Sequence, residues 1–172
     1  VIGGWGVFFH VKEEYRRAFG KEYIKWRDID VFIDGKDAVE FLKIINEIGF
    51  RPSSYNFRYE LIYDREEKEI ISHEKAKKKN IFNLIYIFLD IFSNKNTGKL
   101  GSWVFPSLKN ARIEPIDDCP VLDVNSSIIL KITSFFEREK LDKELKDACD
   151  IYALLNYSGK KIKHSLMVKK AA

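Results

Sequence analysis

The sequence has little cysteine, proline or glycine, and it has no long apolar run. Its 172 residues include two cysteines, Cys119 and Cys149, without a CxxC pair, which excludes a disulfide framework and a cysteine-based zinc site and favours a reducing, cytoplasmic setting. Nine glycines and four prolines beside 45% apolar residues exclude low-complexity, collagen-like and disordered classes. The longest apolar run, Ile81–Phe92, is interrupted by Asn83 and Asp90 and is shorter than the roughly twenty residues that a membrane span needs.

The sequence has the length of one folded domain and a mildly basic net charge. Thirty basic and 26 acidic residues give a formal net charge of +4, which permits a polyanionic partner without requiring one. The segment Val1–Val11 lacks the basic start and small-residue cleavage site of a secretory signal. The chain starts at Val1 without methionine, in what we expect to be a strand, and this leaves open a natural N-terminal segment before it.

Hydrophobic periodicity predicts an α+β fold with a mixed sheet and flanking helices. Apolar residues recur at helical spacing between Asp37, an expected N-cap, and Gly49, an expected C-cap. The polar stretch Arg65–Lys68 suits a hairpin turn. We expect strands at Arg27–Ile33, Asn56–Asp64, Glu69–Ser72 and Ile81–Phe92.

Beyond Asp123 the period becomes helical and predicts a C-terminal helical hairpin. Ser126 or Ser127 is the expected cap of its first helix. An apolar stripe marks the second helix, at Leu141, Leu145, Ala148, Tyr152 and Leu155. We therefore expect a core at residues 1–120, a hairpin packed on it at 121–158 and a basic tail at 159–172.

Two aspartates and a glycine pair form the first candidate site. Asp28 and Asp30 share one face of a strand, with Cα atoms about 6.5–7 Å apart, so both carboxylates can converge on Mg²⁺ or Mn²⁺. Gly3 and Gly4, in a turn before an apolar helix, would let backbone amides approach a phosphate. Each motif alone is also typical of an ordinary exposed strand or turn, but their order within thirty residues favours phosphoryl or nucleotidyl transfer.

A third carboxylate on a neighbouring strand would complete a two-ion site. Asp90 is the best candidate, because a carboxylate inside an apolar strand is costly to bury without a partner. The alternative for Asp90 is a strand-end residue turned to water, and Asp64 is the second choice for the third carboxylate.

Lys131 and Asp147 form a second candidate site on the C-terminal helices. Helical spacing places Lys131 at the rim of an apolar stripe, where its ammonium either contacts a phosphate or extends into solvent. Asp147 shares a face with apolar residues, which indicates a catalytic role or a fixed partner such as Lys131 or Arg27. The same spacing turns Asp150 further toward solvent.

Three segments together resemble the nucleotidyltransferase superfamily typified by DNA polymerase beta, and more narrowly small standalone nucleotidyltransferases of the abortive-infection AbiEii type. They are VIGGWGV at Val1–Val7, RDIDV at Arg27–Val31, and the distal ILKI at Ile129–Ile132 with KDACDIYALL at Lys146–Leu155.

The resemblance implies a role for each matching residue. Asp28, Asp30 and Asp90 would bind Mg²⁺ and act in catalysis. Gly3, Gly4 and Lys131 would hold the triphosphate of an NTP, and Arg27 lies where related proteins have a basic or small residue. Asp147 would support the site or activate the acceptor.

The expected function is thus the metal-dependent transfer of an NMP from an NTP to a hydroxyl acceptor. Basic residues at Lys75–Lys79 and Lys160–Lys170 are compatible with tRNA or another RNA as the acceptor, and an antibiotic or a protein hydroxyl fits the same chemistry. The resemblance implies a toxin with a cognate antitoxin protein as partner. The alternative is a non-catalytic nucleotide- or RNA-binding module of the same fold.

Overall fold

The computed structural model describes residues 1–23, 28–94, 108, 111–137 and 139–162. It is an α+β protein with a mixed sheet and five α-helices in this described part, which confirms the expected class. The chain divides into two compact units, Arg27–Gly101 and a second unit formed by Val1–Trp26 with Ser102–Ala172. The expected boundary after residue 120 coincides with neither unit boundary. Each unit is described separately below.

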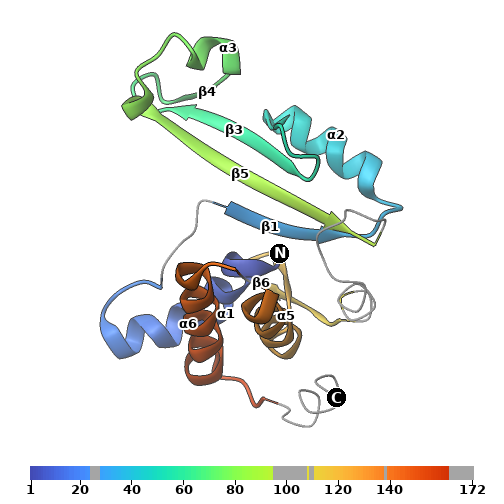
Figure 1. Cartoon of the computed structure of the whole chain (residues 1–172), viewed down its shortest axis with the longest axis vertical. Coiled ribbons are helices and arrows are strands. Elements are labelled where there is room, and N and C mark those ends of the chain that lie inside the picture. Colours follow the sequence, from blue (N-terminus) through green and yellow to red (C-terminus); the bar gives the residue numbers. More distant parts are fainter. Residues whose placement is uncertain (24–27, 95–107, 109–110, 138, 163–172) are drawn as a thin grey trace. The chain divides into compact units, whose positions relative to one another are not determined.

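The sheet belongs to the unit Arg27–Gly101, and the alternating strands fold as expected (Figure 1). Its strand order is β1-β5-β3-β2, and β4 also pairs with β3. β5 runs parallel to β1 and antiparallel to β3. The strands are β1 (Asp28–Ile33), β2 (Arg51–Pro52), β3 (Arg58–Asp64), β4 (Glu69–Ile71) and β5 (Leu84–Ser93).

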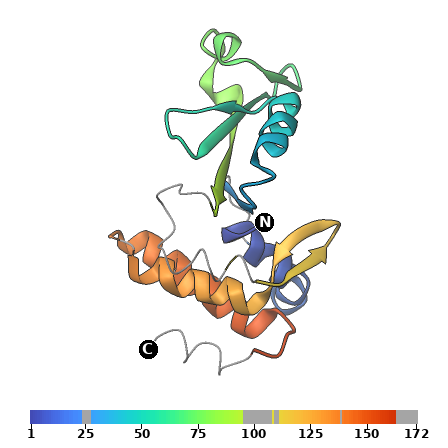
Figure 2. The same cartoon turned by 90° about the vertical axis from the view of Figure 1, so that its right-hand side faces the viewer.

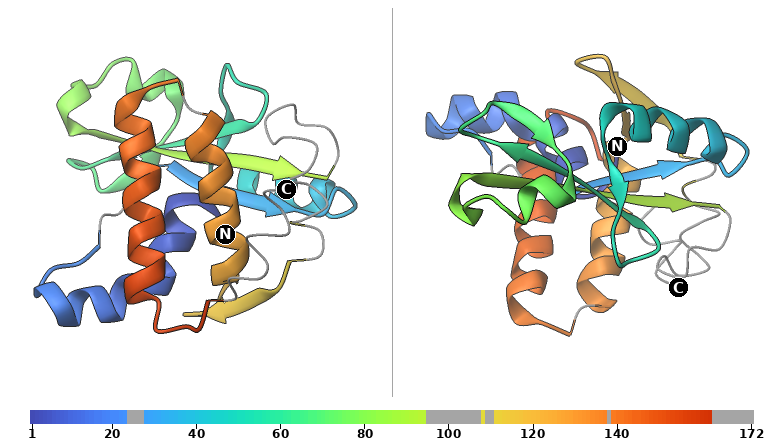
Figure 3. Two further views of the ribbon diagram at one scale, coloured as in Figure 1. Left: turned by 60° about the horizontal axis from the view of Figure 1, so that its bottom comes forward. Right: turned by 90° about the horizontal axis from the view of Figure 1, so that it is seen from above.

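One face of this sheet is covered by helix α2 (Ala38–Ile48), which lies along the strands (Figure 3). Ile45 of α2 is buried against Leu89 and Ile91 of β5, and the alternate residues of β1 join the same cluster. Gly49 ends the helix with φ of 115°, a conformation that favours glycine, as the sequence predicts. Since successive strand residues face opposite sides, the other face carries Asp28, Asp30 and Asp90.

The distal end of the sheet has its own small core. The short helix α3 (His73–Ala76) buries Ala76 against Ile62 of β3 and Ile71 of β4. A 3₁₀ turn, η1 (Ile81–Asn83), precedes β5, because the Asn80 side chain accepts a hydrogen bond from the Phe82 amide. The strand therefore starts three residues later than the apolar run suggests.

The elements that the structure describes in the second unit are the helices α1, α5 and α6 and a β-hairpin. Helices α5 (Val124–Glu137) and α6 (Leu141–Tyr157) pack side by side, as Figure 2 shows and as the sequence predicts. Helix α1 (Gly3–Phe19) packs on both, and its Val7 and Val11 are fully buried with Ile128 and Leu154. The hairpin pairs β6 (Ile113–Ile116) with β7 (Cys119–Leu122).

The structure corrects the expected cap of α5. Ser126 and Ser127 lie inside the helix, and the carboxylate of Asp123 accepts hydrogen bonds from the Asn125 and Ser126 amides at 3.0 and 3.2 Å. Asp123 precedes the serines and is itself a good N-cap residue, so the helix starts three residues earlier than expected.

No helix within the described ranges is both long enough and apolar enough to cross a membrane.

Candidate functional site

The pairing of β1 with β5 brings three predicted carboxylates to one face of the sheet. In the parallel register Asp30 lies directly opposite Asp90, so their Cα atoms are about 4.8 Å apart. Asp28 lies two residues earlier on β1 and points to the same side. Asp28 keeps half of its side chain exposed, whereas Asp90 is 10% exposed. The sequence-based choice of Asp90 as the neighbour of the β1 aspartates therefore agrees with the strand register.

Asp64 lies at the opposite end of the sheet. It ends β3 opposite Leu84, six residues from Asp90 along β5 and so about 20 Å away. Its buried carboxylate accepts hydrogen bonds from the Glu66 and Glu67 amides and lies 3.2 Å from Lys79 Nζ. These contacts fix the turn between β3 and β4.

Arg58 occupies the space beside Asp90, and sequence reasoning missed it. It starts β3 directly opposite Asp90 and donates two hydrogen bonds to that carboxylate, at 2.7 and 2.8 Å. Its guanidinium also lies 4.0 Å from Asp28 and packs over the Phe88 ring, 4.8 Å from the ring centre. The hydrogen bond to Asp90 raises the pKa of Arg58 above its ordinary value, so the guanidinium remains charged.

The carboxylates fit the divalent cation that the resemblance implies only in part. Asp28 and Asp30 supply the hard oxygen donors that Mg²⁺ and Mn²⁺ prefer. Arg58, however, engages both oxygens of Asp90, and no group of three His, Cys, Asp or Glu in the described part of the chain is arranged to hold a metal. Asp28 and Asp30 therefore have the donor type that a hard cation needs, whereas both oxygens of Asp90 are held by Arg58.

In the helical unit, Lys131 is buried and forms ion pairs with two aspartates. Its ammonium lies 2.8 Å from Asp147 and 2.6 Å from Asp150, and both carboxylates are almost fully buried. Lys131 is 7% exposed, so the expected position at the helix rim is wrong, as is the expected exposure of Asp150. The interhelical salt bridge weighed for Asp147 is present.

Tyr23 completes this cluster by donating a hydrogen bond of 2.7 Å to Asp150. Burial and the neighbouring Asp150 carboxylate raise the pKa of the Tyr23 hydroxyl, so it remains protonated. Burial alone would lower the pKa of Lys131, but Asp150 and Asp147 outweigh it and raise that pKa. A charged Lys131 between two carboxylates therefore joins α5 to α6. The hydrogen bond from Tyr23 to Asp150 attaches the segment after α1 to α6.

The glycine pair lies at the start of α1. Gly3 has φ of 63°, which favours glycine, and Gly4 is buried. The expected helix is present, but Gly3 and Gly4 form its first turn instead of a separate turn before it, and only the extended residue Ile2 caps it in place of the expected strand. Arg27, the remaining predicted nucleotide-binding residue, lies outside the described residues.

Sequence reasoning did not place Asp150, Arg58 and Tyr23 at these contacts, and of the three only Asp150 has a local pattern that could have indicated it. Asp150 follows Asp147 by three residues, which is the spacing of neighbours on one helix face. Arg58 begins an alternating strand, but which residue it meets depends on a register that no local pattern reveals. Tyr23 lies beyond the end of α1 and has no pattern of its own.

Comparisons with models of protein families, with curated proteins and with solved structures find no match to this chain.

Proposed function

We propose that the chain is a metal-dependent nucleotidyltransferase whose reaction centre is the carboxylate face of the sheet. The observation that supports this most is the register that pairs Asp30 with Asp90 and places Asp28 on the same side. Three acidic side chains on one sheet face carry more negative charge than the one Arg58 guanidinium beside them can neutralise, which favours a bound cation. The order of the glycine pair and the Asp-x-Asp strand in the sequence supports the same class.

Asp28 and Asp30 would hold a divalent cation that neutralises charge on the α-phosphate of an NTP. The acceptor hydroxyl would lose its proton and bond to the α-phosphorus, the bond to the β-phosphate oxygen would break, and pyrophosphate would leave. The chain's own residues position that cation and the phosphate. Among the described residues Arg58 is the cationic group that contacts the carboxylates, and its planar guanidinium matches two phosphate oxygens as well as it matches Asp90. Arg58 would therefore exchange Asp90 for substrate phosphate, which frees Asp90 to act with Asp30.

The direct test is label transfer from α-labelled NTPs, with Mg²⁺ and total RNA or protein as acceptors. Asp28→Asn and Asp30→Asn should each abolish transfer by removing a carboxylate charge. Asp37→Asn is the matched control, since Asp37 is exposed nearby and its side chain makes no capping hydrogen bond in the described structure. Transfer that survives both β1 substitutions would refute the proposal, as would an absence of transfer with every NTP and acceptor.

One observation favours the second candidate, a non-catalytic nucleotide- or RNA-binding module. The Arg58–Asp90 ion pair already neutralises part of the carboxylate face without any metal. A binding module predicts that NTP or RNA binds equally well with and without Mg²⁺. The enzyme predicts that NTP binding requires the divalent ion and weakens in Asp30→Asn. Equilibrium binding of a fluorescent nucleotide, with and without a chelator, separates the two.

A further inference from the structure

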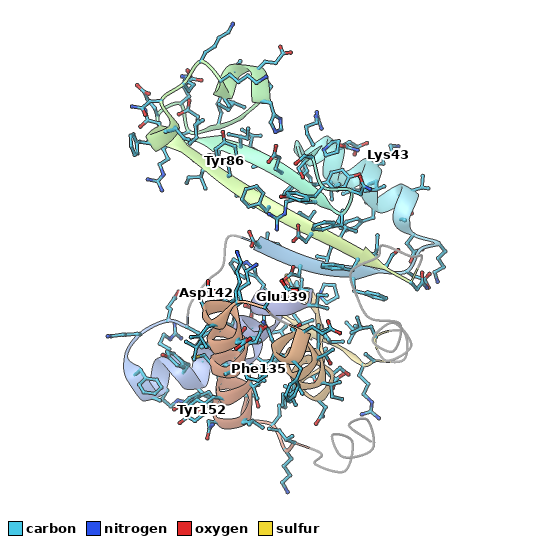
Figure 4. The ribbon with its side chains drawn as sticks, viewed as in Figure 1. Lys43, Tyr86, Phe135, Glu139, Asp142 and Tyr152 are labelled. Carbon is cyan, nitrogen blue, oxygen red and sulfur yellow. The ribbon has the colours of Figure 1, made fainter. Side chains whose placement is uncertain are left out.

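Two aromatic rings lie on the carboxylate face of the sheet, on β5 just before Asp90. Tyr86 and Phe88 precede Asp90 by four and two residues, so all three side chains point to the same side. Their rings are nearly parallel, at 21°, with centres 6.4 Å apart, and both side chains are partly exposed. Figure 4 labels Tyr86, the ring further from Asp90 along the strand. The two rings form an aromatic surface beside the proposed reaction centre.

A polar pair borders this aromatic surface. Glu60 of β3 lies directly opposite Phe88 in the antiparallel register, so its side chain extends from the same face. His73, the first residue of α3, contacts the Glu60 carboxylate through Nε2. Helix α3 lies on this face, because its Ala76 packs on Ile62, two residues after Glu60. The proposed transfer step uses neither Glu60 nor His73, so their place on this face indicates a further role.

We propose that the nucleobase of the NTP stacks on Phe88 and that Glu60 accepts hydrogen bonds from its edge, which favours guanine. This inference rests on the proposed nucleotidyltransferase activity and names the nucleotide that it uses. Phe88 lies about 6.6 Å from Asp90 along β5. A ribose bridges a similar distance between the α-phosphate and the base of a nucleotide. A phosphate at the carboxylates therefore brings the base over the rings.

The charges of this face give the bound nucleotide one direction. Arg58 and the cation attract the phosphates, whereas the Glu60 carboxylate repels them. The guanidinium of Arg58 lies 4.8 Å from the centre of the Phe88 ring. When Arg58 turns to the phosphate, the ring face that it covers becomes available to the base. Stacking on a ring tolerates every base, so Phe88 supplies affinity but little choice among bases.

The choice among bases comes from Glu60, because a carboxylate accepts hydrogen bonds and donates none. Its two oxygens offer about four acceptor positions, so the contact with His73 leaves room for two more donors. Guanine has two adjacent donors, N1–H and the N2 amino group. Adenine and cytosine present an amino group beside a bare ring nitrogen that repels the carboxylate, and uracil places its one N–H between two carbonyl oxygens. Guanine therefore matches Glu60 best.

The test is competition binding to the full chain with Mn²⁺, in which non-hydrolysable analogues of GTP, ITP and UTP displace a fluorescent GTP analogue. GTP should compete about tenfold better than UTP, because hydrogen bonds to a charged group separate them. ITP, which lacks the N2 amino group, should lie between the two. Glu60→Gln should weaken GTP about tenfold and retain UTP, because an amide both donates and accepts. A folding defect cannot produce this change in preference, since it weakens all three nucleotides alike.

Further variants separate the stacking ring from its structural role. Phe88→Leu keeps an apolar side chain but loses the ring, and it should weaken all three nucleotides about fivefold or more. Phe88→Tyr keeps a ring and should retain binding. Phe82→Leu and Glu40→Gln are the matched controls and should behave as wild type. Phe82 is 83% exposed in η1, and Glu40 is exposed on α2, which covers the other face of the sheet.

Three results would overturn the proposal. The first is equal binding of GTP, ITP and UTP by the wild type, which leaves the nucleotidyl transfer itself in place. The second is a preference for GTP that survives Glu60→Gln, because another residue then contacts the edge of the base. The third is nucleotide binding unaffected by Phe88→Leu. Binding of no nucleotide at all, with or without Mn²⁺, would overturn the proposed function as well.

Discussion

At the scale of single residues, Lys131 is the group whose loss the helical unit tolerates least. Its ammonium compensates two buried carboxylates, so Lys131→Met leaves Asp147 and Asp150 without their cation. Removing one partner of a buried ion pair costs about 3–5 kcal/mol. We expect a loss of unfolding free energy of that order in urea titrations followed by circular dichroism.

Two further variants keep this prediction interpretable. Lys143→Met removes an exposed lysine of α6, the helix that carries Asp147 and Asp150, and should change stability by no more than about 0.5 kcal/mol. Asp147→Asn leaves Asp150 to pair with Lys131 and should cost less than Lys131→Met. Equal stability of Lys131→Met and Lys143→Met would show that the buried cluster does not hold the helices together.

Asp64 predicts how the stability of the sheet unit depends on pH. Burial alone would raise its pKa, but hydrogen bonds from the Glu66 and Glu67 amides and the nearby Lys79 outweigh it and lower the pKa below the ordinary 3.8. A carboxyl with a lowered folded-state pKa stabilises the fold fully above its unfolded-state pKa. This contribution is lost as the pH falls through the folded-state pKa.

Wild type should therefore lose stability when the pH falls below about 4, and Asp64→Asn should lose less over the same interval. Urea unfolding at a series of pH values measures both. Parallel curves for the two proteins would show that Asp64 does not anchor the turn.

At the scale of elements, the start of α5 depends on Asp123 and not on the serines that follow it. Replacing an N-cap aspartate by alanine typically costs about 1 kcal/mol, because helix amides lose their acceptor. Asp123→Ala should lower the unfolding free energy by this amount, whereas Ser126→Ala should have a smaller effect. Thermal unfolding of the two variants measures the difference, and a reversed order would contradict the observed cap.

The elements also show what the sequence can predict. β1, β3 and α2 were predicted because period-two alternation and capping residues are local signals. The inner face of α6 was predicted in part. Asp147 was placed on an apolar face with Lys131 as one possible partner, whereas the burial of Asp150 was missed because its partners, Lys131 and Tyr23, lie outside α6. The pairing of Asp90 with Arg58 likewise depends on β3 and β5 being aligned in one register, which is a long-range property.

At the scale of the whole molecule, the two compact units contain different chemistry. The sheet unit gathers Asp28, Asp30 and Asp90 beside Arg58, and the helical unit buries a lysine between two aspartates. The first arrangement leaves Asp28 half exposed, as a binding site requires, whereas the second is shielded from solvent and supports packing. For this reason we assign the proposed chemistry to the carboxylate face.

The central claim is that this carboxylate face binds divalent cations, and the most direct measurement is Mn²⁺ binding by calorimetry with a non-hydrolysable NTP. Wild type should bind Mn²⁺, Asp30→Asn should bind it about tenfold more weakly or worse, and Asp37→Asn should match wild type. Without nucleotide, Arg58→Met should bind Mn²⁺ more tightly than wild type, because it frees both oxygens of Asp90. Absence of Mn²⁺ binding, or binding unaffected by Asp30→Asn, would contradict the account.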